Sequence, residues 1–174
     1  YGVAGDQQAA LFGQSCTKKG NSKCTYGTGL FYLQNVENER LDSKNNLIST
    51  IAINNKGKPI YAIEGSVFIG GAVIQWIRDE LQLIKNVAET ENIANSSDSN
   101  DGVYIVPAFA GLGAPYWNSK CNAIICGLTR GSNKEHIIRA SLESIAYQVN
   151  DLLGCIKKDI GVFPKQLNVD GGAI

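Results

Sequence analysis

Short alternations of hydrophobic and polar residues recur along the chain, and they predict β-strands. Residues 23–34 contain threonine and aromatic residues that favour a strand, while Gly27 and Gly29 mark a tight turn inside the stretch. Residues 47–53 and 60–64 predict a hairpin, because the turn sequence NNKG lies between them. Three shorter apolar runs complete the predicted strands: residues 103–106, 124–128 and 167–169.

Helical spacing of apolar residues predicts two helices in the first half of the chain. The first opens at Asp6 and ends within residues 13–16. The second covers residues 67–84, where apolar residues recur every three or four positions. It would contain the pair Gly70-Gly71. Each glycine disfavours a helix by about 1 kcal/mol relative to alanine, so we expect close packing or a ligand at that pair.

A third and longer helix is predicted near the end of the chain. Ser132 is the expected N-cap, with Glu135 reaching back as in a capping box, and the apolar face continues to about Lys158. His136 lies in the first turn, where we expect a structural role. Residues 92–101 are polar and serine-rich and predict a surface loop. The mixture of strands with long helices indicates an α/β fold.

Composition and charge exclude several classes of partner. The chain has 174 residues and a formal net charge of zero, and it lacks the basic stripe of a nucleic-acid-binding protein. No apolar run is long enough to predict a membrane span. The five cysteines form no CxxC pair, so we expect scattered buried thiols in a reducing cytoplasm. The chain contains no methionine, and each end lies in a glycine-acid loop. We therefore expect a segment of a longer protein.

Asp6 is the first residue whose chemistry is open to two interpretations. As an N-cap, its carboxylate would accept hydrogen bonds from free backbone amides and be stabilised by the helix dipole. Alternatively, it accepts the proton of a substrate hydroxyl, as an aspartate does in other phosphoryl transfers.

Two glycine-rich turns are candidate phosphate sites. In TYGTG, residues 25–29, glycines would let backbone amides approach a phosphate and Thr28 would add a hydroxyl donor. The other interpretation is a strand with a glycine bulge. The sequence contains no Walker A loop. In DGGA, residues 170–173, a strand ending in glycines suits nucleotide approach, and it suits a plain tight turn equally well.

The order and spacing of the motifs are more specific than any one of them. GDQQAALFGQ, TYGTG, PAFAGLGAPYW, GLTRG, HIIRASLESIAYQ and VDGGA follow one another along the chain. In this order they closely resemble the glycerol kinases of the FGGY carbohydrate kinase family, over essentially the whole chain. Residues 123–143 fit the C-terminal signature of that family throughout. The chain departs from the family pattern after PYW, where residues 118–123 replace an Asp-Pro and an Ala-Arg-Gly.

The resemblance implies a ribonuclease H-like, actin-like ATPase domain with a mixed sheet flanked by helices. Residues 1–174 would be part of the C-terminal, nucleotide-binding domain of such a kinase, and its N-terminal FGGY domain would be absent. The implied reaction is the ATP-dependent phosphorylation of glycerol to glycerol 3-phosphate with Mg²⁺, in a cytoplasmic homo-oligomer. We expect the isolated segment to be inactive. The site residues that the resemblance implies are Asp6 as catalytic base, Gln7 and Phe31 at glycerol, and Thr28, Gly71, Gln75 and Gly172 at the nucleotide.

Two alternatives stay open from the sequence. The first is another FGGY kinase, which would act on xylulose, ribulose or gluconate. Phe31 and the motif sequences GDQQAALFGQ and LGAPYW favour glycerol. A non-catalytic actin-like nucleotide-binding module is the second alternative. The presence of Asp6, Gln7 and Thr28 argues against it, because a module that only binds nucleotide needs no base.

Overall fold

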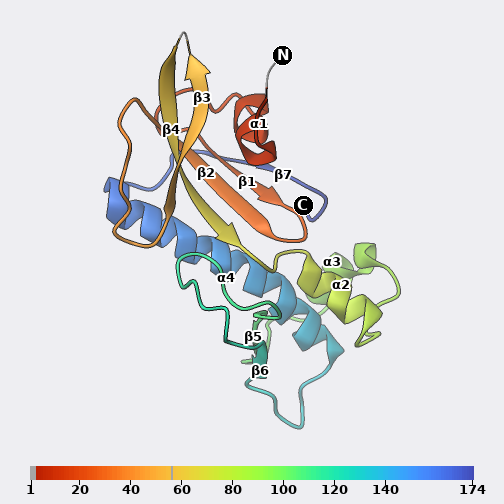
Figure 1. Ribbon diagram of the computed structural model, residues 1–174. Coiled ribbons are helices and arrows are strands. Elements are labelled where there is room, and N and C mark those ends of the chain that lie inside the picture. Colours follow the sequence, from red (N-terminus) through yellow and green to blue (C-terminus); the bar gives the residue numbers. More distant parts are fainter. Residues whose placement is uncertain (1–2, 56) are drawn as a thin grey trace.

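A five-stranded mixed sheet organises the chain (Figure 1). The computed structural model describes residues 3–55 and 57–174. The sheet has the strand order β3-β4-β2-β1-β7, in which all neighbours are antiparallel except β1 and β7, which run parallel. Its strands are β1 (Ser22–Tyr26), β2 (Leu30–Glu37), β3 (Ile48–Asn55), β4 (Lys58–Val67) and β7 (Leu167–Asp170). A separate two-stranded sheet pairs β5 (Tyr104–Val106) with β6 (Ile124–Cys126).

These strands confirm the predicted ones within a few residues. The β1–β2 hairpin turns at residues 27–29, as the two glycines predict. The β3–β4 hairpin is also confirmed, but one residue of its predicted turn, Lys56, lies outside the described residues.

The helices are α1 (Asp6–Gly13), α2 (Ala72–Asp79), α3 (Thr90–Asn95) and α4 (Lys134–Ile160), with a 3₁₀ turn at Val87–Glu89. Helices α1 and α4 cover opposite faces of the sheet (Figure 1). Tyr32 on β2 packs in the larger core with residues of α4, whereas its neighbour Leu33 packs with Leu11 of α1. Because side chains alternate along a strand, one strand supplies both cores.

The predicted helix over residues 67–84 is wrong in its extent. Val67 ends β4, and α2 covers only Ala72–Asp79. The pair Gly70-Gly71 lies before the helix, with Gly71 as its N-cap. Most apolar residues at the helical spacing are buried, although Leu81 is exposed, and they come from a strand, a helix and a loop. Burial from several elements therefore produced a periodicity that looked like one helix.

The predicted surface loop over residues 92–101 is wrong in its first part, where α3 ends at Asn95. Ala94 is buried, and the guanidinium of Arg139 on α4 donates hydrogen bonds to the carbonyls of Ala94 (3.3 Å) and Ser97 (2.7 Å). These contacts to α4 order a polar stretch that has little apolar surface of its own.

Helix α4 extends close to its predicted end, but its predicted N-cap is wrong by one residue. Asn133, and not Ser132, accepts a hydrogen bond from the backbone amide of His136 (3.1 Å). The His136 ring accepts from the Asn133 amide (3.4 Å) and so takes the place predicted for Glu135. The Ser132 hydroxyl instead accepts from the amide of Thr129 (2.8 Å). His136 thus has the structural role that the sequence predicted.

We expect Asn133→Ala to destabilise the protein by about 1 kcal/mol, because the first turn of α4 would lose its side-chain cap. Ser132→Ala is the matched comparison and should have a clearly smaller effect, since its hydroxyl serves a loop amide. Urea unfolding of both variants measures the difference. An equal loss in the two variants would contradict the assignment of the cap.

The cysteines agree with the prediction in part. All five are free thiols in the structure, and Cys16, Cys24 and Cys155 are buried. Cys121 is half-buried and Cys126 is exposed, so these two do not fit the expectation of buried thiols. Among the described residues, no helix has the length and apolar character needed to cross a bilayer.

Candidate active site

The β1–β2 turn supports the start of α2. The amide of Gly70 donates to the carbonyl of Thr28 (2.7 Å), and the amide of Gly71 donates to the carbonyl of Gly27 (2.8 Å). A Cβ atom on Gly71 would lie 2.9 Å from both the Gly27 carbonyl oxygen and the Cβ of Ala173. Only glycine allows the helix start to approach so closely, which is the close packing that the Gly70-Gly71 pair predicted.

The turn after β7 also contacts this region, at the end of β1. Strands β1 and β7 are parallel and therefore end at the same edge of the sheet. The amide of Ala173 donates to the carbonyl of Tyr26 at the end of β1 (3.0 Å). Gly171 has a φ of 108°, in the left-handed region that favours glycine. The carboxyl ends of parallel strands are where α/β proteins bind nucleotides, so this edge is the candidate phosphate site.

The structure thus brings the predicted nucleotide residues to one edge of the sheet. Thr28 and Gly172 are exposed in the β1–β2 turn and in the turn after β7. Gly71 lies between these two turns, and Gln75 is exposed within the first turns of α2. We call the segments 27–29, 70–71 and 171–173 the glycine junction. The sequence predicted each segment separately, and the pairing of β1 with β7 joins them.

Asp6 begins α1, but it is not the N-cap. The N-cap is Gly5, so the interpretation of Asp6 as a capping side chain is wrong by one position. The Asp6 carboxylate is exposed and is held by its neighbour Gln7, whose backbone amide donates to Oδ1 (2.9 Å) and whose side-chain Nε2 donates to Oδ2 (3.3 Å). Asp6 therefore has an exposed carboxylate with a fixed orientation, as a proton acceptor requires.

The Gln7 side chain connects Asp6 to the sheet. Its Oε1 accepts a hydrogen bond from Nζ of Lys23, which lies on β1 and is completely buried. The same Nζ donates to the Thr25 hydroxyl (2.9 Å), two residues nearer to the glycine junction. A polar chain therefore runs from Asp6 through Gln7 and Lys23 to Thr25, along the face of β1 that α1 covers.

Asp170 at the end of β7 borders the same polar chain. Its Oδ2 accepts from Nε2 of Gln14, just after α1 (2.5 Å). Burial alone would raise the pKa of Asp170, but the Thr25 hydroxyl, the Gln14 amide and the charge of Lys23 together lower it below its ordinary value. Burial also lowers the pKa of Lys23, and the negative charges around it, that of Asp170 foremost, only partly oppose this. The region next to the exposed Asp6 thus contains a buried cation, Lys23, and a stabilised anion, Asp170.

Phe31 shares the sheet face of Lys23 and Thr25. It pairs with Thr25 across the β1–β2 ladder, and it lies two residues before Leu33, whose side chain packs against α1. Because side chains two residues apart on a strand point to the same face, Phe31 lies on the α1 side near the turn. The predicted substrate residues Asp6, Gln7 and Phe31 therefore belong to one face of the sheet, and the nucleotide residues belong to its adjoining edge.

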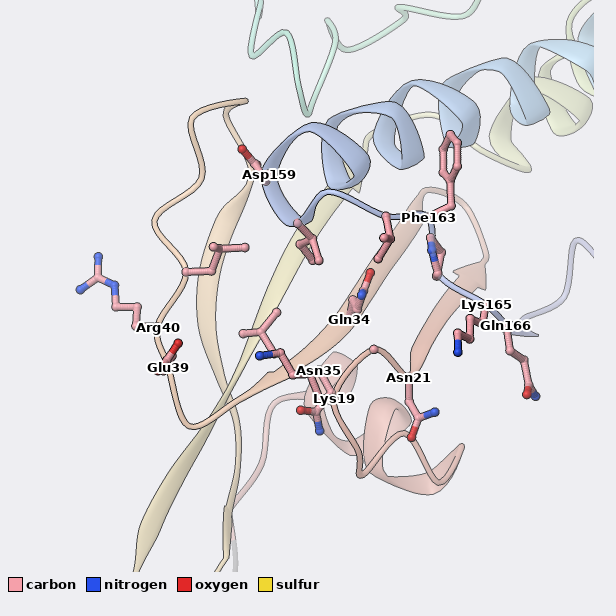
Figure 2. Close-up of a pocket in the computed structure, with 16 residues that line it drawn as sticks. Lys19, Asn21, Gln34, Asn35, Glu39, Arg40, Asp159, Phe163, Lys165 and Gln166 are labelled. Atoms are coloured by element: carbon pink, nitrogen blue, oxygen red, sulfur yellow. The ribbon is translucent and has the colours of Figure 1, made fainter.

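Two hollows of the described surface lie elsewhere. One hollow, of about 690 Å³, lies at the opposite end of the β1–β2 hairpin. Figure 2 shows the residues that line it, which include the last residues of α4 and the segment that follows. The second, of about 900 Å³, lies between α1 and β3. None of the predicted site residues lines either hollow, although the second includes Gly5 next to Asp6.

Sequence analysis did not single out Lys23, Gln14 or Asp170 as members of the site. The only signal for Lys23 was a lysine placed between residues that favour a strand. Its burial depends on α1 packing on this face of the sheet, which no local pattern reveals. Asp170 was noted as part of a turn sequence, but its bond to Gln14 joins residues 156 positions apart.

Comparison with known proteins agrees with this geometry. Residues 22–174 match the model of the C-terminal domain of the FGGY family of carbohydrate kinases. The chain belongs to this family. The FGGY domain here is 59% identical over 172 residues to the glycerol kinase of Clostridium botulinum strain Hall, which covers 99% of this chain and 34% of that protein. It is 58% identical over 173 residues to the glycerol kinase of Shewanella woodyi, which covers 99% of this chain and 35% of that protein.

Solved structures confirm the predicted fold of the FGGY domain. A crystal structure of Plasmodium falciparum glycerol kinase with ADP superimposes with a TM-score of 0.90 at 40% identity, covering 98% of this chain and 34% of that one. A xylulose kinase from Lactobacillus acidophilus, at 23% identity and a TM-score of 0.84 over 97% of this chain and 34% of that one, shares the fold alone. The fold is that of the actin-like ATPases, with a mixed sheet between helices. The chain spans about a third of the length of the relatives it matches.

Proposed function

We propose that the protein carrying this chain transfers the γ-phosphoryl group of ATP to glycerol and so forms glycerol 3-phosphate. The observation that carries the proposal is the joint placement of an exposed, oriented carboxylate at Asp6 and the glycine junction at the ends of β1 and β7. Similarity to proteins named glycerol kinase, one of them solved with ADP, supports the same reaction.

Each of the proposed site residues has a separate role in the reaction. A glycerol hydroxyl is far too weak an acid to lose its proton freely, so Asp6 accepts that proton as the oxygen bonds to phosphorus. Backbone amides of the glycine junction and the Thr28 hydroxyl bind the phosphates and orient the γ-phosphoryl group for in-line attack. Phe31 packs against the carbons of glycerol, while Gln7 lies beside Asp6. Gly71, Gln75 and Gly172 belong to the nucleotide side.

The residues described are compatible with Mg²⁺ bound together with the nucleotide. The described part of the chain contains no group of three or more His, Cys, Asp or Glu side chains that could hold a metal by itself. Mg²⁺ takes most of its ligands from water and substrate phosphates and needs only one or two carboxylates. The exposed carboxylate of Asp6 fits that need, and the ion would neutralise charge on the β- and γ-phosphates. A cytoplasmic homo-oligomer stays a prediction.

A substrate panel on the full-length protein tests the proposal. We expect glycerol to give the highest kcat/KM, at least about a hundredfold above xylulose, ribulose and gluconate, because a pocket fitted to the hydroxyls of its substrate discriminates by such factors. ADP release with each substrate is the measurement. If kcat/KM were highest for one of the other three substrates, that compound and not glycerol would be the substrate of the protein. Binding of ATP without turnover on any substrate would favour the non-catalytic nucleotide-binding module instead.

A further inference from the structure

Lys23 is a buried cation that touches no carboxylate among the described residues, although the charge of Asp170 acts on it from nearby. It is among the largest side chains that are completely buried. Among the ion pairs of residues 3–55 and 57–174, none within 4.0 Å includes Lys23. Its two hydrogen-bond partners are neutral, namely Oε1 of Gln7 and the hydroxyl of Thr25. Lysine is rarely buried without a charged partner, so this arrangement needs an explanation.

The contact with Lys23 sets the orientation of the Gln7 amide. An ammonium group has three donors and no acceptor, so it can only bind the oxygen of that amide. The nitrogen must then point the other way, and it donates to Oδ2 of Asp6 (3.3 Å). If the amide were turned over, Gln7 would present an oxygen to the carboxylate and would repel it. The buried charge therefore ensures that Asp6 faces a donor.

We propose that Lys23 is a positioning residue for the base Asp6 and acts on it through the Gln7 side chain. The proposal rests on the proposed function, since it concerns the residue that accepts the substrate proton. Lys23 touches neither substrate nor reacting atoms. It fixes one amide, and that amide fixes the direction of the carboxylate that must meet the substrate hydroxyl. A small error in such an orientation lowers the rate strongly even when the ligands still bind.

A purely structural role for Lys23 predicts a different result. Because burial lowers the pKa of Lys23, the charged form is less stable in the folded protein than in water. Replacement by a neutral side chain removes this penalty, but it also removes the donor to Gln7 and Thr25 and the charge that stabilises Asp170, so the melting temperature does not separate the two roles. A lysine kept only for stability would leave kcat of the folded variant unchanged.

The test is Lys23→Met in the full-length protein, with glycerol and ATP as substrates. We expect kcat to fall by at least about tenfold and KM for ATP to change less than about twofold, as the loss of an orienting contact predicts. The matched control is Gln34→Met, which removes another buried polar side chain at the far end of the same hairpin. Its kcat should stay within about twofold of the unmodified protein.

A double-mutant cycle tests whether Lys23 acts through Gln7. In a Gln7→Ala background, Lys23→Met should lower kcat by less than about twofold, because the amide that it orients is already gone. Additive losses would overturn the proposal, as would a normal kcat in Lys23→Met. If the Met variant does not fold, Lys23→Leu is a second neutral replacement, and a normal kcat there overturns the proposal equally. If the unmodified protein shows no glycerol-dependent turnover, the proposed function fails first and this proposal fails with it.

Discussion

Asp6→Asn is expected to lower kcat of the full-length protein by about a thousandfold or more, in line with the effect of losing a positioned general base. Asparagine keeps the size and the acceptor oxygen of the side chain but cannot take up the proton of the substrate hydroxyl. The carboxylate is exposed, and among residues 3–55 and 57–174 only Gln7 donates hydrogen bonds to it. The loss should therefore fall on turnover and leave the fold and the binding of Mg²⁺-free ATP intact.

Steady-state kinetics and ATP titration together check this expectation. Asp98→Asn is a suitable control, because Asp98 is an exposed aspartate that lies outside the proposed site. It should leave kcat and Tm unchanged. A thermal scan of both variants guards against unfolding as the cause. If Asp6→Asn kept more than a tenth of the normal kcat, Asp6 could not be the base.

The second large effect is expected from Gly171→Ala, which we predict to destabilise the protein by roughly 3 kcal/mol and to raise KM for ATP at least about tenfold. Two independent features produce it. The φ of 108° disfavours any residue with a side chain. A Cβ atom would also lie 2.1 Å from the carbonyl oxygen of Tyr26, which is backbone and cannot move aside as a flexible side chain could. The turn after β7 would have to leave the glycine junction.

Gly154→Ala provides the comparison for this substitution. Gly154 lies inside α4, and apart from its chain neighbours and the backbone of its own helix no described heavy atom lies within 4 Å of the position that its Cβ would take. Alanine there should raise the free energy of unfolding by about 0.5–1 kcal/mol, because it stabilises a helix interior. Urea unfolding and ATP-dependent kinetics of both variants measure the contrast. An unchanged KM for ATP in Gly171→Ala would show that the nucleotide does not need this turn.

Local patterns sufficed for the elements whose residues act together over many positions. The 27 residues of α4 repeat one apolar face, and the two glycines at 27 and 29 fix the β1–β2 turn. The same reasoning failed for residues 67–84, because a strand end, a loop and a short helix each buried apolar residues at helical intervals. The cap of α4 was missed by one position, since both Ser132 and Asn133 are common N-cap types and only the backbone geometry separates them.

The site was predictable as parts but not as an arrangement. The glycine turns could each be found in the sequence, whereas their meeting depends on β7 pairing with β1, which no local signal records. The link from Asp6 to Thr25 was missed for the same reason. It exists because α1 packs on this face of the sheet and its Gln7 contacts a buried lysine that most strands would leave in water. Tertiary packing decides which polar residues are buried, and local propensity does not predict that packing.

The parallel ladder that aligns Ser22 with Leu167 has a consequence for the order of assembly. Strand β1 reaches its final neighbour only after everything between them has been synthesised and folded, so this pairing is the one with the largest loop to close. A binding edge that depends on it exists only in the finished domain. Bound nucleotide should accordingly slow unfolding much more than it speeds folding. It would stabilise the finished domain and would not guide its folding.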